Sequence, residues 1–206
     1  MARPSLVLFA GGVIAIALVI AIATGVILAG RSSSASGETS AAGTPLIGGD
    51  FNLVNQNGQP VDQTMLNGKW SLVFFGFTFC PEFCPTTLAE LAVVQQRLGK
   101  DADRFQIIFV SIDPERDTPQ ALKDYLSSDG FPKGTIGLSG TAEQTAQAAK
   151  AYRAYYAKVG SGDSYTMDHS LTVYLMGPDG KFRTALTYGL GPDKSVQLIQ
   201  DALAKG

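Results

Sequence analysis

A buried strand that leads directly into a pair of cysteines is the feature that most constrains this sequence. Residues Trp70–Phe77 (WSLVFFGF) form a continuous apolar, aromatic and β-branched run, which is typical of a strand buried on both faces of a sheet. Cys80 and Cys84 follow, and Thr87–Glu90 has the pattern of a helix-capping box ahead of an apolar stripe. The two thiols are therefore expected between a core strand and a helix N-terminus.

The rest of the chain predicts alternating strands and helices. Phe51–Val54 and the Asn57–Gly58 turn indicate a hairpin, and Phe105–Ile112 indicates a second buried strand. Thr118 is expected to cap a helix whose first residue is Pro119. The remaining predicted elements are a short strand at Thr135–Leu138, an Ala-rich helix from the Thr141–Gln144 capping box to about Lys158, a β-hairpin of Ser170–Met176 and Lys181–Thr187, and a helix at Lys194–Ala204.

This order of elements predicts an α/β, thioredoxin-like fold. We expect a mixed central sheet of four or five strands, flanked by helices on both faces and preceded by the N-terminal hairpin. The first strand-to-helix turn of such a fold holds the two cysteines. The predicted domain covers residues 50–206.

A long apolar segment precedes this domain. Residues Leu6–Gly30 contain no charged side chain, and as a helix they would extend about 37 Å, enough to cross about 30 Å of hydrocarbon. A cleavable signal peptide is the alternative, but its apolar region usually has only about 7 to 15 residues. Residues 1–31 are therefore predicted to be a short cytoplasmic stub and one transmembrane helix.

The charges beside the apolar segment predict its orientation. Arg3 and the terminal amine before it favour a cytoplasmic N-terminus, although Arg31 follows it. The chain is thus expected in a bacterial inner membrane with its folded domain in the periplasm. Residues 32–49, rich in Ser, Ala, Gly and Thr, predict a flexible linker. With 16 basic and 18 acidic side chains, the protein has no excess positive charge for binding nucleic acid.

Cys80 and Cys84 are the only two cysteines of the chain. A Cys-x3-Cys pair in a turn brings both sulfurs to one small volume, where they either form a disulfide or hold a soft metal such as copper(I) or zinc. The positive end of the following helix favours the thiolate form. A purely structural disulfide is the alternative, but closing so small a loop stabilises a fold little.

His169 is the only histidine, and it directly precedes the apolar strand segment Leu171–Leu175. In a thioredoxin-like sheet, the turn entering this strand lies close to the turn with the cysteines. Two thiolates and a neutral imidazole suit three-coordinate copper(I), and they leave a position for copper(II) or for a donor from a partner. A Cys-x3-Cys spacing, and His169–Ser170 where thiol oxidoreductases of this fold have a cis-proline, favour metal binding over thiol exchange.

Three carboxylates are expected at the same edge of the sheet as these candidate ligands. Asp113 follows the second buried strand and is a candidate for orienting a ligand or for weak oxygen ligation, and Asp168 beside His169 is a second candidate for orienting a ligand. Asp117 is expected to cap the next helix, and Arg116 to pair locally with a carboxylate.

Three motifs together resemble the Sco/SenC family of cytochrome c oxidase assembly proteins: FTFCPEFCP, VSIDPERDTP and DHSLTVYLMGPDGKF. The resemblance extends from Phe51 to the C-terminus. It implies a thioredoxin-like fold, copper ligation by Cys80, Cys84 and His169, and a single membrane anchor. It also implies that copper is taken from an upstream donor protein and delivered to the binuclear copper site of oxidase subunit II.

Two functions remain open from the sequence. The first is a copper metallochaperone, which transfers the ion by ligand exchange and has no turnover of its own. The second is a membrane-anchored thiol-disulfide reductase in which Cys80 and Cys84 form a redox-active pair that acts on the cysteines of the oxidase copper site. A peroxidase is a more distant alternative.

Overall fold

The computed structural model describes residues 47–206. The predicted transmembrane helix (1–31) and most of the predicted linker (32–49) lie outside the described residues. From residue 47 onward, no helix has both the length and the apolar character needed to span a bilayer. Ile47 packs against the core, and the Gly48 N–H donates a hydrogen bond to the Ala151 carbonyl at 3.0 Å.

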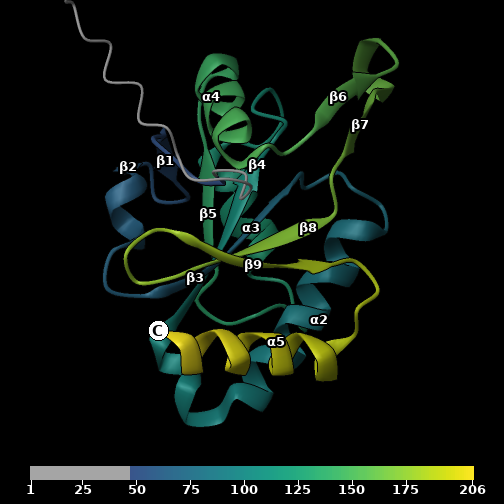
Figure 1. Cartoon of the computed structure of the whole chain (residues 1–206). Coiled ribbons are helices and arrows are strands. Elements are labelled where there is room, and N and C mark those ends of the chain that lie inside the picture. The colour runs from purple at the N-terminus through teal and green to yellow at the C-terminus, as the bar shows by residue number, and fades with distance from the viewer. Residues whose placement is uncertain (1–46) are drawn as a thin grey trace, which may run out of the picture. The chain divides into compact units, whose positions relative to one another are not determined.

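A seven-stranded mixed sheet forms the centre of the domain, with the order β2-β1-β5-β4-β3-β8-β9 (Figure 1). Strands β3, β4 and β5 are parallel, and the other neighbours are antiparallel. The strands are β1 (Asn52–Asn55), β2 (Pro60–Asp62), β3 (Trp70–Gly76), β4 (Phe105–Ser111), β5 (Ile136–Ser139), β8 (Thr172–Met176) and β9 (Phe182–Thr187).

The predicted thioredoxin-like arrangement is confirmed, but the predicted size of the sheet is wrong. The N-terminal hairpin does not stand apart, because Val54 of β1 pairs with Ser139 of β5 and extends the sheet by two strands. A strand's hydrophobic pattern shows that one face is buried, but it does not reveal which strand lies alongside it.

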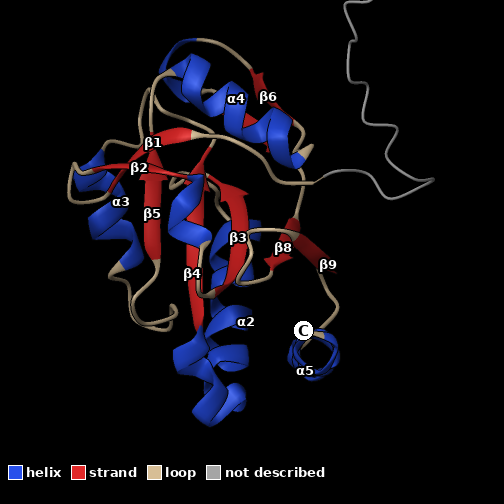
Figure 2. Ribbon diagram, turned by 60° about the vertical axis from the view of Figure 1, so that its left-hand side comes forward, coloured by secondary structure: helices blue, strands red, loops and turns tan. Residues whose placement is uncertain are grey.

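Helices cover both faces of the sheet, as predicted (Figure 2). They are α2 (Phe83–Leu98), α3 (Pro119–Leu126), α4 (Ala142–Tyr152) and α5 (Pro192–Lys205). Phe75 and Phe74 are neighbours on β3 and point to opposite faces. The Phe75 ring lies 5.3 Å from Tyr152 of α4, whereas Phe74 lies 5.9 Å from Phe109, which in turn contacts Tyr125 of α3. Helix α2 contacts α5 and covers the Phe74 face.

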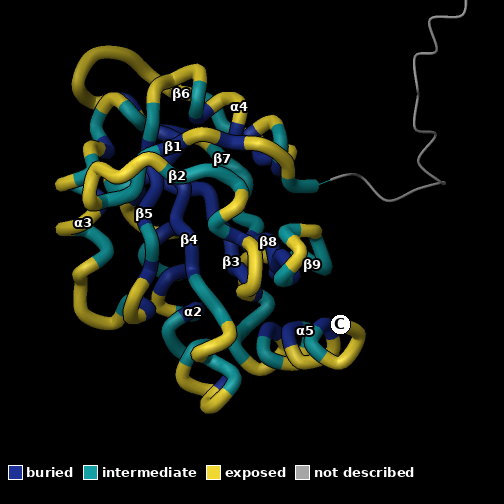
Figure 3. Tube along the Cα trace, turned by 90° about the vertical axis from the view of Figure 1, so that its left-hand side faces the viewer, coloured by how far each residue is buried: buried dark blue, intermediate teal, exposed yellow. Residues whose placement is uncertain are grey.

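The core centres on β3 and β4, whose traces run through the interior of the domain (Figure 3). Every residue of β3 is buried, and the last five residues of β4 are buried as well. Full burial of an aliphatic or aromatic side chain stabilises a fold by about 1.5–3 kcal/mol. The predicted core strands are thereby confirmed, and the end of β3 is held in place by dense apolar packing.

Two of the predicted helix starts are confirmed. Thr118 caps α3, its hydroxyl accepting from the Ala121 N–H, and Pro119 is the first helical residue. Thr141 and Gln144 form the reciprocal capping box of α4. The predicted end of this helix at Lys158 is wrong, however. The helix stops where Arg153 adopts a left-handed φ of 53°, and the next segment forms a strand.

Helix α2 begins earlier than the capping pattern predicts. It starts at Phe83, and Thr87 lies buried inside the helix, so the interpretation of Thr87–Glu90 as a capping box is wrong. Pro85 is tolerated because it falls in the first helical turn, where its missing N–H has no intrahelical partner. Cys84 therefore belongs to the first turn of the helix itself.

Two hairpins shape the C-terminal half. The predicted hairpin of β8 and β9 is confirmed, and its turn is closed by the Gly177 N–H donating to the Lys181 carbonyl at 2.8 Å. The second hairpin was not predicted: among the described residues, β6 (Tyr156–Val159) pairs with β7 (Thr166–His169) alone, and the two form a separate two-stranded sheet. We call this segment, residues 156–169, the histidine hairpin.

Candidate metal centre

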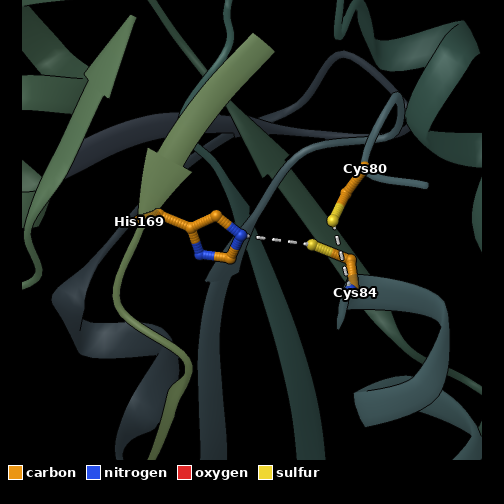
Figure 4. Close-up of side chains that lie close together, drawn as sticks. All are labelled: Cys80, Cys84 and His169. Atoms are coloured by element: carbon orange, nitrogen blue, oxygen red, sulfur yellow. Dashed lines mark hydrogen bonds between the residues drawn. The ribbon is translucent and has the colours of Figure 1, made fainter. Parts of the chain in front are cut away.

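Two sulfurs and one imidazole meet at the end of β3. One ligand atom from each of Cys80, Cys84 and His169 lies within 4.8 Å of the other two (Figure 4). The Cys84 Sγ and His169 Nε2 atoms are 3.6 Å apart although the residues are separated by 85 positions. The sequence prediction that these three residues converge is borne out by this geometry.

Local structure places the cysteines. Strand β3 ends at Gly76, and the Cys80 N–H then donates to the Phe77 carbonyl at 3.2 Å, which turns the chain toward α2. The Cys84 N–H, in the first turn of α2, points at the Cys80 sulfur at 3.4 Å. Both thiols are free, and Cys84 is 0% exposed whereas Cys80 is 7% exposed.

Asp117 anchors the segment that leads to the cysteines. Its buried carboxylate accepts hydrogen bonds from the Thr78 hydroxyl at 2.6 Å, the Thr78 N–H at 3.1 Å and the Ser111 hydroxyl at 2.6 Å. Burial raises the pKa of Asp117, and these hydrogen bonds oppose the rise. The predicted capping role of Asp117 is wrong because Thr118 caps the helix. A buried long-range bond of this kind leaves no local signal in the sequence.

The environment of His169 determines which ring nitrogen faces the sulfurs. Its Nδ1 atom lies 2.9 Å from the Ser170 carbonyl oxygen. A carbonyl oxygen only accepts, so Nδ1 carries the proton and Nε2 directs its lone pair toward the cysteines. The ring also packs edge-on against Phe77 at 5.8 Å. This is the arrangement of a metal-binding histidine whose second nitrogen is held by a hydrogen bond.

The two thiols differ sharply in acidity. A hydrogen bond from the Cys84 side chain, with further hydrogen bonds from the backbone N–H groups of Cys84 and Glu82, lowers the pKa of Cys80 to about 4 against the opposing effect of burial. Interaction with Cys80, together with burial, raises the pKa of Cys84. At neutral pH, Cys80 is thus a thiolate and Cys84 a thiol, which loses its proton when both sulfurs bind a cation.

The spacing of the three ligand atoms suits a small soft cation. With bonds of about 2.3 Å to sulfur and about 2.0 Å to nitrogen, a planar three-coordinate set needs roughly 3.7–4.0 Å between ligand atoms. The Cys84–His169 contact of 3.6 Å already meets this spacing. Two sulfurs and one nitrogen are a soft donor set, preferred by copper(I) and zinc over magnesium or calcium.

An open pocket of about 670 Å³ borders the centre, and we call it the site pocket. Its apolar side includes the exposed side chains of Phe83 and Val159, and its rim includes the exposed carboxylates Glu82 and Asp168. In the part of the chain that the structure describes, no lysine or arginine lines it. The residues that line it are Phe77, Cys80, Pro81, Glu82, Phe83, Val159, Thr166, Met167, Asp168, His169 and Leu171.

The two candidate orienting carboxylates occupy different places. Asp113 is 2% exposed and binds Arg116, as predicted for local pairing, and also Tyr165 of the histidine hairpin. Asp168 is exposed, and within residues 47–206 its side chain makes no hydrogen bond to His169. The group that holds the His169 ring is instead the Ser170 carbonyl, which no sequence motif would have revealed.

Comparisons with known proteins agree with the motif resemblance. The SCO1/SenC family model matches residues 39–204. The mitochondrial protein SCO1 homolog 1 of Arabidopsis thaliana is 39% identical over 177 residues, which cover 85% of this chain and 51% of that protein. The chain therefore spans about half the length of such mitochondrial relatives.

Solved structures match the fold described above. Bradyrhizobium japonicum ScoI with copper bound is 44% identical, with a TM-score of 0.68 over 75% of this chain and 98% of that chain. BsSco, described as a member of the Sco family of cytochrome c oxidase assembly proteins with a disulfide switch, is 27% identical, with a TM-score of 0.61 over 80% of this chain and 99% of that chain. From the family match, the sequence identity and the shared fold, we conclude that the chain belongs to the SCO1/SenC family.

Proposed function

We propose that this protein is a copper metallochaperone that carries one copper(I) ion on Cys80, Cys84 and His169. The observation that carries the proposal is the convergence of three soft ligand atoms within 4.8 Å, with the lone pair of His169 Nε2 facing the sulfurs. The copper-bound structure of the Bradyrhizobium relative supports copper as the cargo. A three-coordinate ion also leaves room for an incoming ligand.

Transfer proceeds by ligand exchange in this proposal. An incoming thiolate or imidazole of the recipient enters from the site pocket, where the half-buried His169 and the less buried Cys80 are accessible. It binds the ion before the protein's own ligands leave one after another, so bare copper is never released. Cys84, which lies in the core, is the last of the three ligands to release the copper ion.

The recipient we propose is the binuclear copper site of cytochrome c oxidase subunit II, supplied with copper through this protein from an upstream donor. The motif resemblance and the description of BsSco as an oxidase assembly protein support this assignment. We further propose a single-pass anchor in residues 1–31 that holds the domain on the periplasmic side of the bacterial inner membrane. Confinement of donor and recipient to one membrane raises their effective concentration.

The test is an anaerobic copper(I) titration of the purified full chain against a chromophoric chelator. Wild type is expected to bind one equivalent. His169→Ala should lower the affinity by more than the 10- to 100-fold typical of losing an outer-sphere partner, because a ligand itself is lost. Asp163→Asn, at the exposed tip of the histidine hairpin, is the matched control and should bind as wild type. Equal affinities of wild type and His169→Ala would refute the proposed ligand set.

A second function is favoured by one observation, the unequal acidity of the thiols. Cys80, with a pKa of about 4, is poised to attack a partner disulfide, releasing one partner sulfur as a thiolate. The Cys84 thiol then loses its proton and attacks the Cys80 sulfur, releasing the second partner thiolate and leaving a Cys80–Cys84 disulfide. A cysteine-based reductant must restore the pair. His169→Ala separates the functions, because it should leave this reductase reaction intact while copper binding falls.

A further inference from the structure

Arg116 lies between the two segments that supply the metal ligands. Its guanidinium carbon is 3.7 Å from the ring centre of Tyr165 in the histidine hairpin, and 4.6 Å from that of Phe79, the residue before Cys80. Its Nη1 atom donates to the Tyr165 carbonyl oxygen at 3.0 Å. One side chain thus touches both the cysteine segment and the histidine hairpin.

Asp113 fixes this arginine to the end of β4. One carboxylate oxygen accepts from Arg116 Nε at 2.5 Å, and the other accepts from the Tyr165 hydroxyl at 2.5 Å. The backbone N–H of Asp113 donates to the Ser111 hydroxyl at 3.0 Å. Because Asp113 is buried, these charge-assisted contacts are shielded from water and favour a single geometry.

The histidine hairpin needs such an attachment. Within residues 47–206, its two strands pair with each other and not with the seven-stranded sheet, so the β7–β8 connection holds it to the sheet only at the His169 end, where β8 pairs with β3. His169 is its last residue, four positions after Tyr165. The position of Tyr165 therefore holds β7 on the side of His169 that β8 does not hold, and so contributes to the place of the imidazole relative to the sulfurs.

We propose that Arg116 is a positioning residue for the copper site, joining the segment of Cys80 to the hairpin of His169 and setting the distance between sulfurs and imidazole. The inference rests on the proposed copper function. It is specific to arginine, because only a planar guanidinium can stack between two aromatic rings while donating to a carboxylate and a carbonyl. Lysine keeps the charge but not this geometry.

The experiment compares Arg116→Ala and Arg116→Lys with wild type by two measurements. The first is copper(I) affinity by chelator competition, which we expect to fall about 10- to 100-fold in both variants, as for other groups that orient metal ligands. The second needs no copper: His169 is the only histidine, so its ring proton signals in the NMR spectrum of the metal-free protein report its surroundings alone. We expect these signals to shift or broaden in both variants.

Glu115→Gln is the matched control. It removes the exposed ion pair between Glu115, which is next to Arg116, and Lys158, which lies on the histidine hairpin. It should leave affinity and the His169 signals unchanged. Folded Arg116 variants with wild-type copper affinity and unshifted His169 signals would overturn the proposal. Wild-type copper affinity of Arg116→Lys alone would also overturn it, because the proposal requires the guanidinium. Failure of wild type itself to bind copper would instead refute the proposed function, so the two failures are distinguishable.

Discussion

The sulfur ligands and the imidazole ligand are held by two different kinds of structure. Cys84 is fully buried where β3 meets α2, and its sulfur is enclosed by apolar packing at the end of the main sheet. His169 ends a separate two-stranded hairpin that is tied down by hydrogen bonds and by cation–π contacts from Arg116. Packing makes one half of the site a part of the core, whereas polar contacts attach the other half to it.

The largest expected effect concerns the acidity of the cysteine half. With a pKa of about 4, Cys80 should react with iodoacetamide at a nearly constant rate from pH 6 to pH 8. An ordinary thiol of pKa about 8.5 would change about 80-fold over that range, because its thiolate fraction follows pH. Stopped-time labelling followed by mass spectrometry measures the profile.

Cys80→Ser provides the control for this labelling, since Cys84 is 0% exposed and should remain almost unmodified because the reagent cannot reach its sulfur. A rate that rises about tenfold per pH unit in wild type would show that Cys80 is a thiol of ordinary acidity. The cysteine half of the site would then not differ in thiol acidity from an ordinary dithiol.

The next effect tests the packing of the cysteine half. A Cβ atom at Gly76 would lie 2.7 Å from the Cys84 sulfur and 2.8 Å from the Phe109 ring, so Gly76→Ala should overpack the core. We expect the free energy of unfolding in urea to fall by about 3 kcal/mol, with a weaker copper affinity. Lys69→Ala, at the exposed residue just before the same strand, is the control. An unchanged urea midpoint for Gly76→Ala would mean that this half is not tightly packed.

A smaller effect is expected in the histidine half. Tyr165→Phe removes only the hydroxyl that donates to the Asp113 carboxylate, a loss of about 1.5 kcal/mol for a bond to a charged group. Amide hydrogen exchange should quicken in residues 156–169 more than in β3. Tyr188→Phe, at an exposed tyrosine, serves as control. Equal acceleration in both regions would contradict the view that the hairpin is attached separately.

The core strands and most helices were predictable because they depend on local patterns. The apolar runs ending at Phe77 and Ile112 each correspond to a buried strand of the sheet. The predicted capping box at Thr141 and the predicted helix start at Thr118–Pro119 are confirmed, because cap hydrogen bonds are local to the helix. The capping pattern at Thr87 failed because the buried first turn of α2 outweighs a favourable cap further along the chain.

Two of the features that were missed depend on contacts between distant residues. The pairing of β1 with β5 and the bonds between Asp117 and Thr78 join segments tens of residues apart. The histidine hairpin is local, and it was missed because the predicted Ala-rich helix was extended through residues 156–158. Nothing in a local window distinguishes a strand that continues a sheet from one that pairs elsewhere. A local window also does not distinguish a carboxylate that is buried in the fold from one that caps a helix.

The sequence by itself determined the chemistry of the site: two cysteines at the end of a core strand, one histidine before another strand, and the motifs of the SCO1/SenC family. Only the tertiary structure decided which nitrogen of His169 faces the sulfurs, how the two thiols differ in acidity, and that Arg116 links the two halves. Residue types are written in the chain, but distances, burial and hydrogen-bond partners arise only when remote segments pack together.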